Sequence, residues 1–344
     1  MVKDSWKRVP IWGRKGYGVR MVRYLVQHDA RMPSVNRLTA LPELPDIEVY
    51  LDALRRHVVG RRLRGYRSGN PFVLRTVTPT PSEAVGRHLT SVSRIGKRIV
   101  LEFEGSIWFV IHLMIAGRLR WRKPGAAMPG RRGLAALDFD PGTLLLTEEG
   151  RKKRASLHVV VSRENLEALD PGGVEVTDLG AGQFASVLRR DNRTLKRALT
   201  DPHIFSGIGN AYSDEILHYA RMSPFRRTRQ LSDEEVETLR RSTLFVLSDW
   251  IGRLRREVGD GFPEKVTAFR DGMAVHGRYG EPCPVCDAPV QRIVYVENEA
   301  NYCASCQTGG KVLADRSLSR LLKDDWPGTL EELEALNERR RGAR

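Results

Sequence analysis

Four cysteines form two closely spaced pairs whose arrangement suits a single metal ion. Cys283 and Cys286 lie in "CPVC", and Cys303 and Cys306 lie in "CASC", with sixteen residues between the pairs. Two such pairs supply four thiolates, the donor set of a tetrahedral structural zinc site. The intervening "VQRIVYV" favours a β-hairpin. The sequence therefore predicts a zinc ribbon that holds one structural Zn²⁺, with no open position for a catalytic water.

A second motif, "GIGN" at 207–210, precedes a segment of helical periodicity. Glycines allow close backbone approach, and free N–H groups at a helix N-terminus bind phosphate. Asn210 can add its side-chain amide to the same phosphate, and Lys196 lies on the preceding predicted helix. An ordinary helix–turn–helix corner, with glycine for packing and Asn210 as a cap, explains the motif equally well.

The charge of the chain favours a polyanionic partner. Its 344 residues carry 57 Lys+Arg against 42 Asp+Glu, a net charge of +15, which indicates nucleic acid or an anionic membrane. The most apolar stretch, 106–117, is too short to span a bilayer and is interrupted by His112. Residues 1–30 lack the apolar core of a secretory signal. We therefore expect a cytoplasmic protein.

The elements that must position these motifs change in character along the chain. Residues 1–40 carry a charge of +7 and no sustained period. From Asp46, apolar residues recur at helical spacing up to Gly60, a candidate C-cap. Expected strands then follow at 62–68, 89–104, 106–121, 135–148 and 153–162. Helices are expected at 181–190, 192–201, 210–222 and 232–258, the last opened by a capping box of Ser232 and Glu235.

Six motifs occur together in one order: "PELPDIE", "GKR", "HLMIAGRL", "GIGNAYSDEIL", "HGRYGEPCPVC" and "YCASCQ". With them the chain resembles the formamidopyrimidine-DNA glycosylase/endonuclease VIII family of base-excision repair enzymes, from about Pro42 to Gln307. The resemblance implies an α+β multidomain fold with DNA in a basic cleft. Its implied parts are a catalytic domain at 42–167 with an N-terminal helix and a two-layered β-sandwich, a helix–two-turn–helix DNA-binding domain at 177–270 and a zinc finger at 271–310, with a linker at 168–176 between the first two. Outside these parts lie an extension at 1–41, which we do not expect in the mature enzyme, and a mixed-charge tail at 311–344.

The resemblance also implies a catalytic group. In this family the mature chain begins at the proline of "PELP", whose free amine is the nucleophile, which here is Pro42. By family position Glu43 is the acid/base partner, and Lys97 in "IGKR" reaches the DNA at the lesion. A proline inside a chain cannot act in this way, because its nitrogen is an amide with a delocalised lone pair.

Other family positions imply DNA contacts, and some of them differ here. Asn210 and Arg278 match residues that grip phosphates. Ile115 stands where the family has a methionine that fills the gap left by the flipped base. Asn298 replaces the arginine of the finger, and 147–156 does not resemble the loop that probes the opposite base. We expect the missing phosphate clamp to be replaced, with Lys311 as the leading candidate beside Arg292 and "GRKKR" (150–154).

The expected function is therefore that of a bifunctional DNA glycosylase/AP lyase, which excises damaged bases and nicks the strand of double-stranded DNA. We expect it to act as a monomer, without a membrane, at the bacterial nucleoid. Two alternatives remain open. One is a catalytically silent DNA-binding protein of the same fold, and the other is a zinc-ribbon module for protein interaction.

Overall fold

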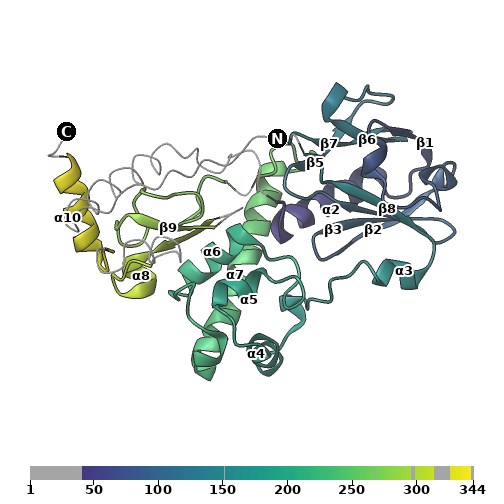
Figure 1. Cartoon of the computed structure of the whole chain (residues 1–344). Helices are drawn as coiled ribbons and strands as arrows, with labels where there is room; N and C mark the ends of the chain where they lie inside the picture. Colours follow the sequence, from purple (N-terminus) through teal and green to yellow (C-terminus); the bar gives the residue numbers. More distant parts are fainter. Residues whose placement is uncertain (1–40, 151, 268, 296–298, 314–325, 342–344) are drawn as a thin grey trace, which may run out of the picture. The chain divides into compact units, whose positions relative to one another are not determined.

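The computed structural model describes residues 41–150, 152–267, 269–295, 299–313 and 326–341. Its first element is helix α2 (Leu44–Val58), which begins directly after Pro42 and Glu43 (Figure 1). The carboxylate of Asp46 accepts the backbone N–H of Glu43 at 3.0 Å and so caps the first turn. The apolar positions of the helical pattern are buried, which confirms the expected helix: Ile47, Leu51, Leu54 and Val58.

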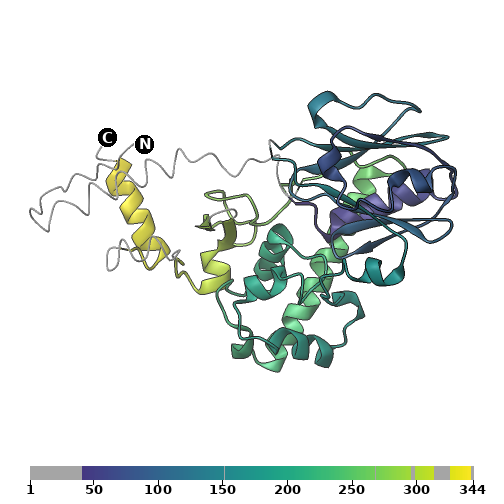
Figure 2. The same cartoon turned by 45° about the vertical axis from the view of Figure 1, so that its right-hand side comes forward.

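Two antiparallel sheets of four strands follow α2 and form the layers of a β-sandwich (Figures 1 and 2). One sheet has the order β1–β6–β7–β5, and the other has the order β2–β3–β4–β8. Apolar side chains from both sheets and from α2 share one buried cluster. The strands are β1 (Leu63–Ser68), β2 (Leu89–Ile95), β3 (Arg98–Phe103), β4 (Ile107–His112), β5 (Gly117–Arg122), β6 (Gly133–Phe139), β7 (Gly142–Glu148) and β8 (Ser156–Val160).

Three of the expected strands are each divided in the structure. The segment 89–104 turns at Gly96, which has φ 57°, and 135–148 turns before Gly142. The segment 106–121 contains β4 and β5, which belong to different sheets. The residues between them include Met114 at φ 52°, a left-handed conformation. Alternation of apolar residues continues through such short turns, so the pattern alone did not locate them.

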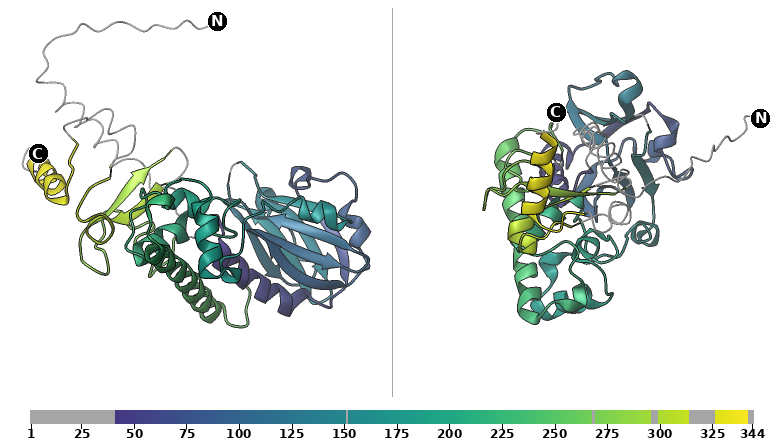
Figure 3. Two further views of the ribbon diagram at one scale, coloured as in Figure 1. Left: turned by 90° about the horizontal axis from the view of Figure 1, so that it is seen from below. Right: turned by 60° about the vertical axis from the view of Figure 1, so that its left-hand side comes forward.

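Helices replace strands after the short helix α3 (Arg163–Glu167), which the sequence analysis did not predict. The helical domain contains α4 (Ala181–Arg189), α5 (Leu195–Thr200), α6 (Asn210–Tyr219) and α7 (Asp233–Val258). The capping box of α7 is confirmed: Ser232 Oγ accepts from Glu235 N at 3.2 Å, and the Glu235 carboxylate accepts from Ser232 N at 2.9 Å. Helix α7 also contacts α2. Figure 3 shows the same ribbons from two more sides.

The finger contains the expected hairpin, with β9 (Val290–Val294) antiparallel to β10 (Glu299–Cys303), followed by α8 (Ala304–Thr308). Beyond it, the segment 310–312 pairs with 328–330. Val312 N donates to Gly328 O at 2.9 Å, and Leu330 N donates to Gly310 O at 3.2 Å. Helix α10 (Leu330–Arg341) starts from this pairing. The residues 41–313 and 327–341 belong to one compact unit.

The described helices do not include a membrane-spanning candidate, since none of them is both long enough and apolar enough to cross a bilayer.

Candidate active site and zinc centre

The side chain of Glu43 is buried against the N-terminus of α6. It is 2% exposed. One carboxylate oxygen accepts the backbone N–H groups of Gly209 at 2.7 Å and Tyr212 at 3.2 Å, and the other accepts that of Ala211 at 2.8 Å. A helix N-terminus favours negative charge. The residue that follows Pro42 is therefore held as an oriented carboxylate by a segment more than 160 residues away.

These contacts bear on the two interpretations of "GIGN". Backbone N–H groups at the start of α6, which one interpretation assigned to a phosphate, are occupied by Glu43. Asn210 Nδ2 donates to the carbonyl oxygen of Glu299 at 2.7 Å and links α6 to the finger hairpin. A DNA contact by Asn210 stays a prediction.

The structure also corrects the interpretation of Lys196. This residue is 6% exposed, and its ammonium donates to Asp214 Oδ1 and to the carbonyl oxygen of Asn210, each at 2.6 Å. An ammonium that is buried and paired in this way is not available to a phosphate. Lys196 instead neutralises a carboxylate on α6, and the other oxygen of that carboxylate contacts His276 Nδ1 at 2.8 Å.

Glu215, the next residue of α6, holds the segment that leads to the finger. Its buried carboxylate accepts the backbone N–H groups of Ala274, Val275 and His276 at 2.7 to 2.9 Å. Burial raises the pKa of Glu215, and the three N–H donors oppose that rise. Helix α6 thus positions both Glu43 and the approach to the finger.

Lys97 lies in the β2–β3 turn, and its ammonium converges with Glu43 over Gly209. A Cβ atom at Gly209 would lie 2.6 Å from Lys97 Nζ and 2.5 Å from the carboxylate carbon of Glu43. Burial lowers the pKa of Lys97, and the negative charges of Glu43 and Asp46 oppose this effect. The absence of a side chain at Gly209 is what lets a cation and a carboxylate meet there.

The lowered pKa of Lys97 should make the stability of the folded protein depend on pH. A lysine whose pKa is lower in the folded protein destabilises the fold below that pKa, and the cost is relieved as pH rises through it. Lys97→Met should therefore raise the melting temperature at pH 7, and its advantage over the parent should shrink toward pH 10. Thermal unfolding at both pH values tests this, with exposed Lys152→Met as the control. An advantage that is absent or grows with pH would contradict it.

Asp46 and Arg270 form a buried ion pair beside the Glu43 backbone. Arg270 Nη2 lies 2.9 Å from Asp46 Oδ1, and the two side chains are 9% and 0% exposed. Burial raises the pKa of Asp46, although Arg270 and the N–H of Glu43 act in the opposite direction. Arg270 is not among the predicted site residues, because nothing in the local sequence marks an arginine that pairs with a carboxylate more than 220 residues earlier.

Arg270 also lines a cavity of about 670 Å³ between β5 and the segment that follows α7. Arg118, from β5, holds one wall by donating from Nε to the carbonyl oxygen of Val266 at 2.7 Å. Phe269 and His276 line the cavity and stack with ring centroids 5.3 Å apart. Among the described groups, no hydrogen-bond partner is found for the buried Nε of Arg270. The cavity is thus lined by an aromatic pair together with charged and polar side chains.

Basic side chains gather on the outer face of the β2–β3–β4–β8 sheet, at the end near Lys97. The strand register places Arg98 opposite His112, and His158 opposite Val110, so these side chains share a face. The pKa of His112 falls to about 4, first through burial and then through the charges of Arg98 and Lys97. Near neutral pH the positive charge of this group therefore comes from Arg98 and Lys97, which can attract a polyanion.

Ile115 lies in the connection between β4 and β5. It is partly exposed, and its carbonyl oxygen accepts from Arg118 Nη1 at 3.2 Å. The preceding residue, Met114, has a φ of 52°, a strained conformation for a side-chain-bearing residue. The side chains of Met114 and Ile115 therefore project from a turn rather than from a strand. Insertion of Ile115 into DNA stays a prediction.

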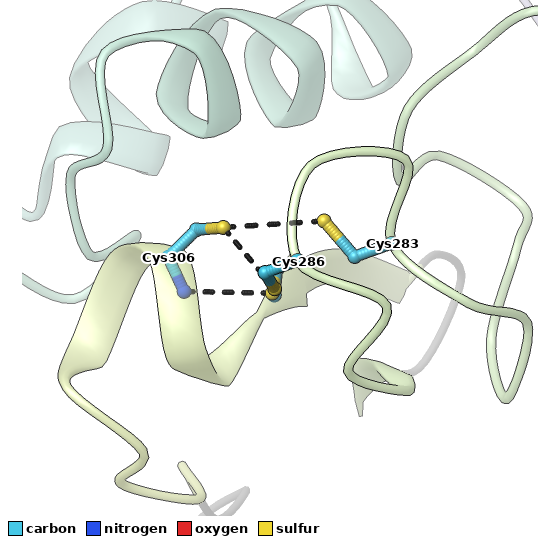
Figure 4. A group of neighbouring side chains, drawn as sticks. Cys283, Cys286 and Cys306 are labelled. Carbon is cyan, nitrogen blue, oxygen red and sulfur yellow. Dashed lines mark hydrogen bonds between the residues drawn. The ribbon is translucent and has the colours of Figure 1, made fainter.

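The four cysteines come together as the spacing predicted, and Figure 4 labels three of them, Cys283, Cys286 and Cys306. Their sulfur atoms all lie within 4.8 Å of one another, and the separations include 3.4 Å for Cys286–Cys303 and 4.0 Å for Cys283–Cys306. A tetrahedron with zinc–sulfur bonds of about 2.3 Å has edges of about 3.8 Å. Both the donor set and the separations therefore fit one structural zinc ion.

The arginines of the finger that were expected near DNA, Arg278 and Arg292, have different partners within the protein. Arg278 donates from Nε to Glu281 at 2.8 Å and from Nη1 to the carbonyl oxygen of Met273 at 3.1 Å, so it braces its own loop. Arg292 lies 4.3 Å from the ring centre of Tyr279 and pairs with Glu299. Asn298 lies outside the described residues.

The basic segments proposed as replacements for the clamp also differ from one another. Lys311 is exposed beside the tail segment, in an isolated bridge with Thr329. In "GRKKR", Lys153 donates to the carbonyl oxygen of Glu148, whereas Arg151 lies outside the described residues. A phosphate contact by Lys311 stays a prediction.

Models of known protein families match the β-sandwich, the helical domain and the finger of this chain. Three family models match: the formamidopyrimidine-DNA glycosylase N-terminal domain over 41–155, the formamidopyrimidine-DNA glycosylase H2TH domain over 171–256, and the zinc finger found in FPG and IleRS over 280–309. The formamidopyrimidine-DNA glycosylase of Chloroflexus aurantiacus is 31% identical over 278 residues, which cover 78% of this chain and 98% of that protein. That of Thermus thermophilus is 32% identical over 284 residues, covering 78% and 100%.

Solved structures agree on the fold. Lactococcus lactis Fpg in complex with a THF-DNA and an inhibitor has a TM-score of 0.69 at 23% identity, over 78% of this chain and all of that one. MutM in complex with carbocyclic 8-oxo-G containing DNA has a TM-score of 0.68 at 23% identity, with the same coverage. Since the matched domains follow one another as the sandwich, the helical domain and the finger do here, and since the relatives are matched along nearly their whole length, the chain belongs to the formamidopyrimidine-DNA glycosylase family.

Proposed function

We propose that this protein excises damaged, chiefly oxidised, bases from duplex DNA and then cleaves the strand, with the amine of Pro42 as nucleophile. The observation that carries the proposal is the Glu43 carboxylate. It directly follows Pro42, and three backbone N–H groups and the facing Lys97 ammonium orient it. A structural helix cap would not require a second domain to bury it.

The chemistry begins at the sugar of the damaged nucleotide. The lone pair of the Pro42 nitrogen forms a bond to C1′, and the damaged base leaves with the electron pair of the glycosidic bond. The Glu43 carboxylate accepts the proton that the nitrogen loses and passes it to the ring oxygen, and the C1′–O4′ bond opens to give an iminium. The iminium acidifies C2′–H, so loss of that proton expels the 3′ phosphate by β-elimination. A further δ-elimination expels the 5′ phosphate.

Other groups of the site bind and orient the DNA. The cavity lined by Phe269, Arg270 and His276 is large enough for an extruded base, which it can stack and hydrogen-bond. Arg98 lies near Lys97, and these two cations can contact phosphates. When bound, the zinc ion supplies the structure of the finger and no catalytic position, since four thiolates complete its coordination.

The proposal requires that the mature chain begin at Pro42, because a proline preceded by Leu41 has no free amine. The family model begins its match at residue 41, and the curated relatives are matched almost completely while covering 78% of this chain. A second candidate function follows from the same fact. If residues 1–41 stay attached, the protein binds damaged DNA without cutting it.

Borohydride reduction on an abasic-site duplex separates the two functions. A chain that starts at Pro42 should form a covalent DNA adduct, and the full chain with an intact N-terminus should not. Peptide mapping should locate the adduct at Pro42. Equal trapping by the full chain, or an adduct on Lys97, would overturn the assignment of the nucleophile. DNA binding by both chains without trapping would support the silent function.

A further inference from the structure

The last turn of α6 places a histidine against the cysteine cluster. His218 is 6% exposed, and its Nε2 lies 3.3 Å from Cys283 Sγ. Cys283 itself is fully buried. The contact joins the helical domain to a residue of the finger, 65 positions along the chain.

The chemistry of the cluster decides the direction of this hydrogen bond. A cysteine that binds zinc does so as a thiolate, which carries no proton and can only accept. The imidazole must therefore carry a proton on Nε2 and donate it to the sulfur. Four thiolates around a divalent ion leave a net charge of −2, and buried negative charge of this kind is stabilised by N–H donors.

Two other sulfur atoms receive N–H groups from within the finger. Cys306 N donates to Cys303 Sγ at 3.5 Å, and the backbone of Ala288 bonds to the sulfur of Cys286. The donor to Cys283 comes instead from α6. A second link runs in parallel, because Gln307 accepts the N–H of Cys303 at 2.8 Å and donates to the carbonyl oxygen of Met222 at 2.9 Å, just beyond α6.

We propose that His218 is a positioning residue of the zinc site, which holds the Cys283 thiolate on the metal and lowers its reactivity toward electrophiles and oxidants. A donated N–H withdraws electron density from the sulfur, so the thiolate is a poorer nucleophile. It is also less readily lost as the first ligand to dissociate from the zinc. The opposite end of α6 holds Glu43, and so one helix anchors the metal site and the catalytic carboxylate. The proposal concerns the finger and does not depend on the reaction at Pro42.

A purely space-filling role would make a different prediction, and two variants of the full chain separate the roles. His218→Phe fills a similar volume without a donor. His218→Gln keeps an N–H near the position of Nε2. Tyr219→Phe is the matched control, because it alters the next residue of α6, which is 53% exposed and stacks on Phe245.

Two measurements report on the sulfur itself. Competition with a chromogenic chelator should show zinc affinity reduced by about 10-fold or more in His218→Phe, the usual size of losing a hydrogen bond to a metal ligand. In Co²⁺-substituted protein, the sulfur-to-metal charge-transfer band should shift to longer wavelength, because the sulfur electrons are no longer stabilised by the N–H. His218→Gln should recover most of both properties, and Tyr219→Phe should match the parent.

The outcomes are decisive in both directions. If His218→Phe has the parent's affinity and band, His218 only fills space and the proposal is wrong. If His218→Gln loses affinity as much as His218→Phe, while both melt like the parent, the donor is not the relevant property, and the proposal is again wrong. A band shift confined to His218→Phe supports it even where that variant has a lower melting temperature, because lost packing does not change the charge-transfer energy of a bound site.

Discussion

Glu43→Gln, introduced into the chain that starts at Pro42, should reduce base excision by about 10²–10⁴-fold, the contribution of a positioned acid/base group. The carboxylate accepts three backbone N–H groups, at Gly209, Ala211 and Tyr212. A glutamine amide has one oxygen and would turn its NH₂ toward a donor. The variant loses both the transferable proton and the orientation. Single-turnover excision on a lesion duplex measures the effect.

The same variant should bind abasic-site DNA within a few-fold of the parent, because Glu43 is buried and acts on the sugar rather than on phosphates. Glu48→Gln is the matched control, since Glu48 lies on the same helix but pairs with Arg94 at 2.6 Å. Zinc content and melting temperature check that α2 and α6 stay joined. Near-parental excision by Glu43→Gln in a folded protein would remove Glu43 from the mechanism.

Gly209→Ala should abolish most activity while sparing the fold. The added methyl would meet the ends of two flexible side chains, Glu43 and Lys97, at 2.5 and 2.6 Å. Since φ at this glycine is −133°, alanine adopts the backbone without strain. Both side chains must therefore move, and a displacement of about 1 Å at a reacting group can cost about 10²-fold in rate.

Gly182→Ala provides the control for this change. Gly182 lies in α4 of the same domain, and a Cβ there meets nothing within 4 Å. That variant should excise like the parent. If Gly209→Ala retains full activity, the convergence of Glu43 and Lys97 is not needed for the reaction. If the Gly209→Ala protein unfolds or loses zinc, the side-chain ends of Glu43 and Lys97 are less free to move than the length of these side chains suggests.

Local patterns accounted for the features that depend on local sequence. The spacing of Cys283 to Cys306, the apolar period of α2 and the capping box of Ser232 are each complete within a short stretch. The resemblance then supplied Pro42 and Glu43. Neither source indicated how Glu43 is held, because its partners lie on α6 and only the fold brings them together.

The failures have the same physical origin. The motif at the start of α6 suits an anion site and an ordinary helix corner equally well, and a sequence does not say whether such an anion is a phosphate or a carboxylate of the same chain. Lys196 was taken for a phosphate contact, since a lysine on a helix is usually exposed. It is buried because Asp214, eighteen residues later, faces it. Arg270 and its cavity lie in a segment without periodicity, where no pattern could place them.

The pairing of 310–312 with 328–330 sets a practical boundary for anyone designing a minimal enzyme. The match to the family zinc-finger model ends at residue 309, so a designer could choose to end a shortened chain there. Such a cut would remove both segments of this pairing, together with Leu313 N, whose bond to the Tyr302 hydroxyl is 2.7 Å long, so that the hydroxyl would lose this donor. Shortened versions of this protein should therefore keep the chain through residue 341, or replace that pairing with a designed hairpin.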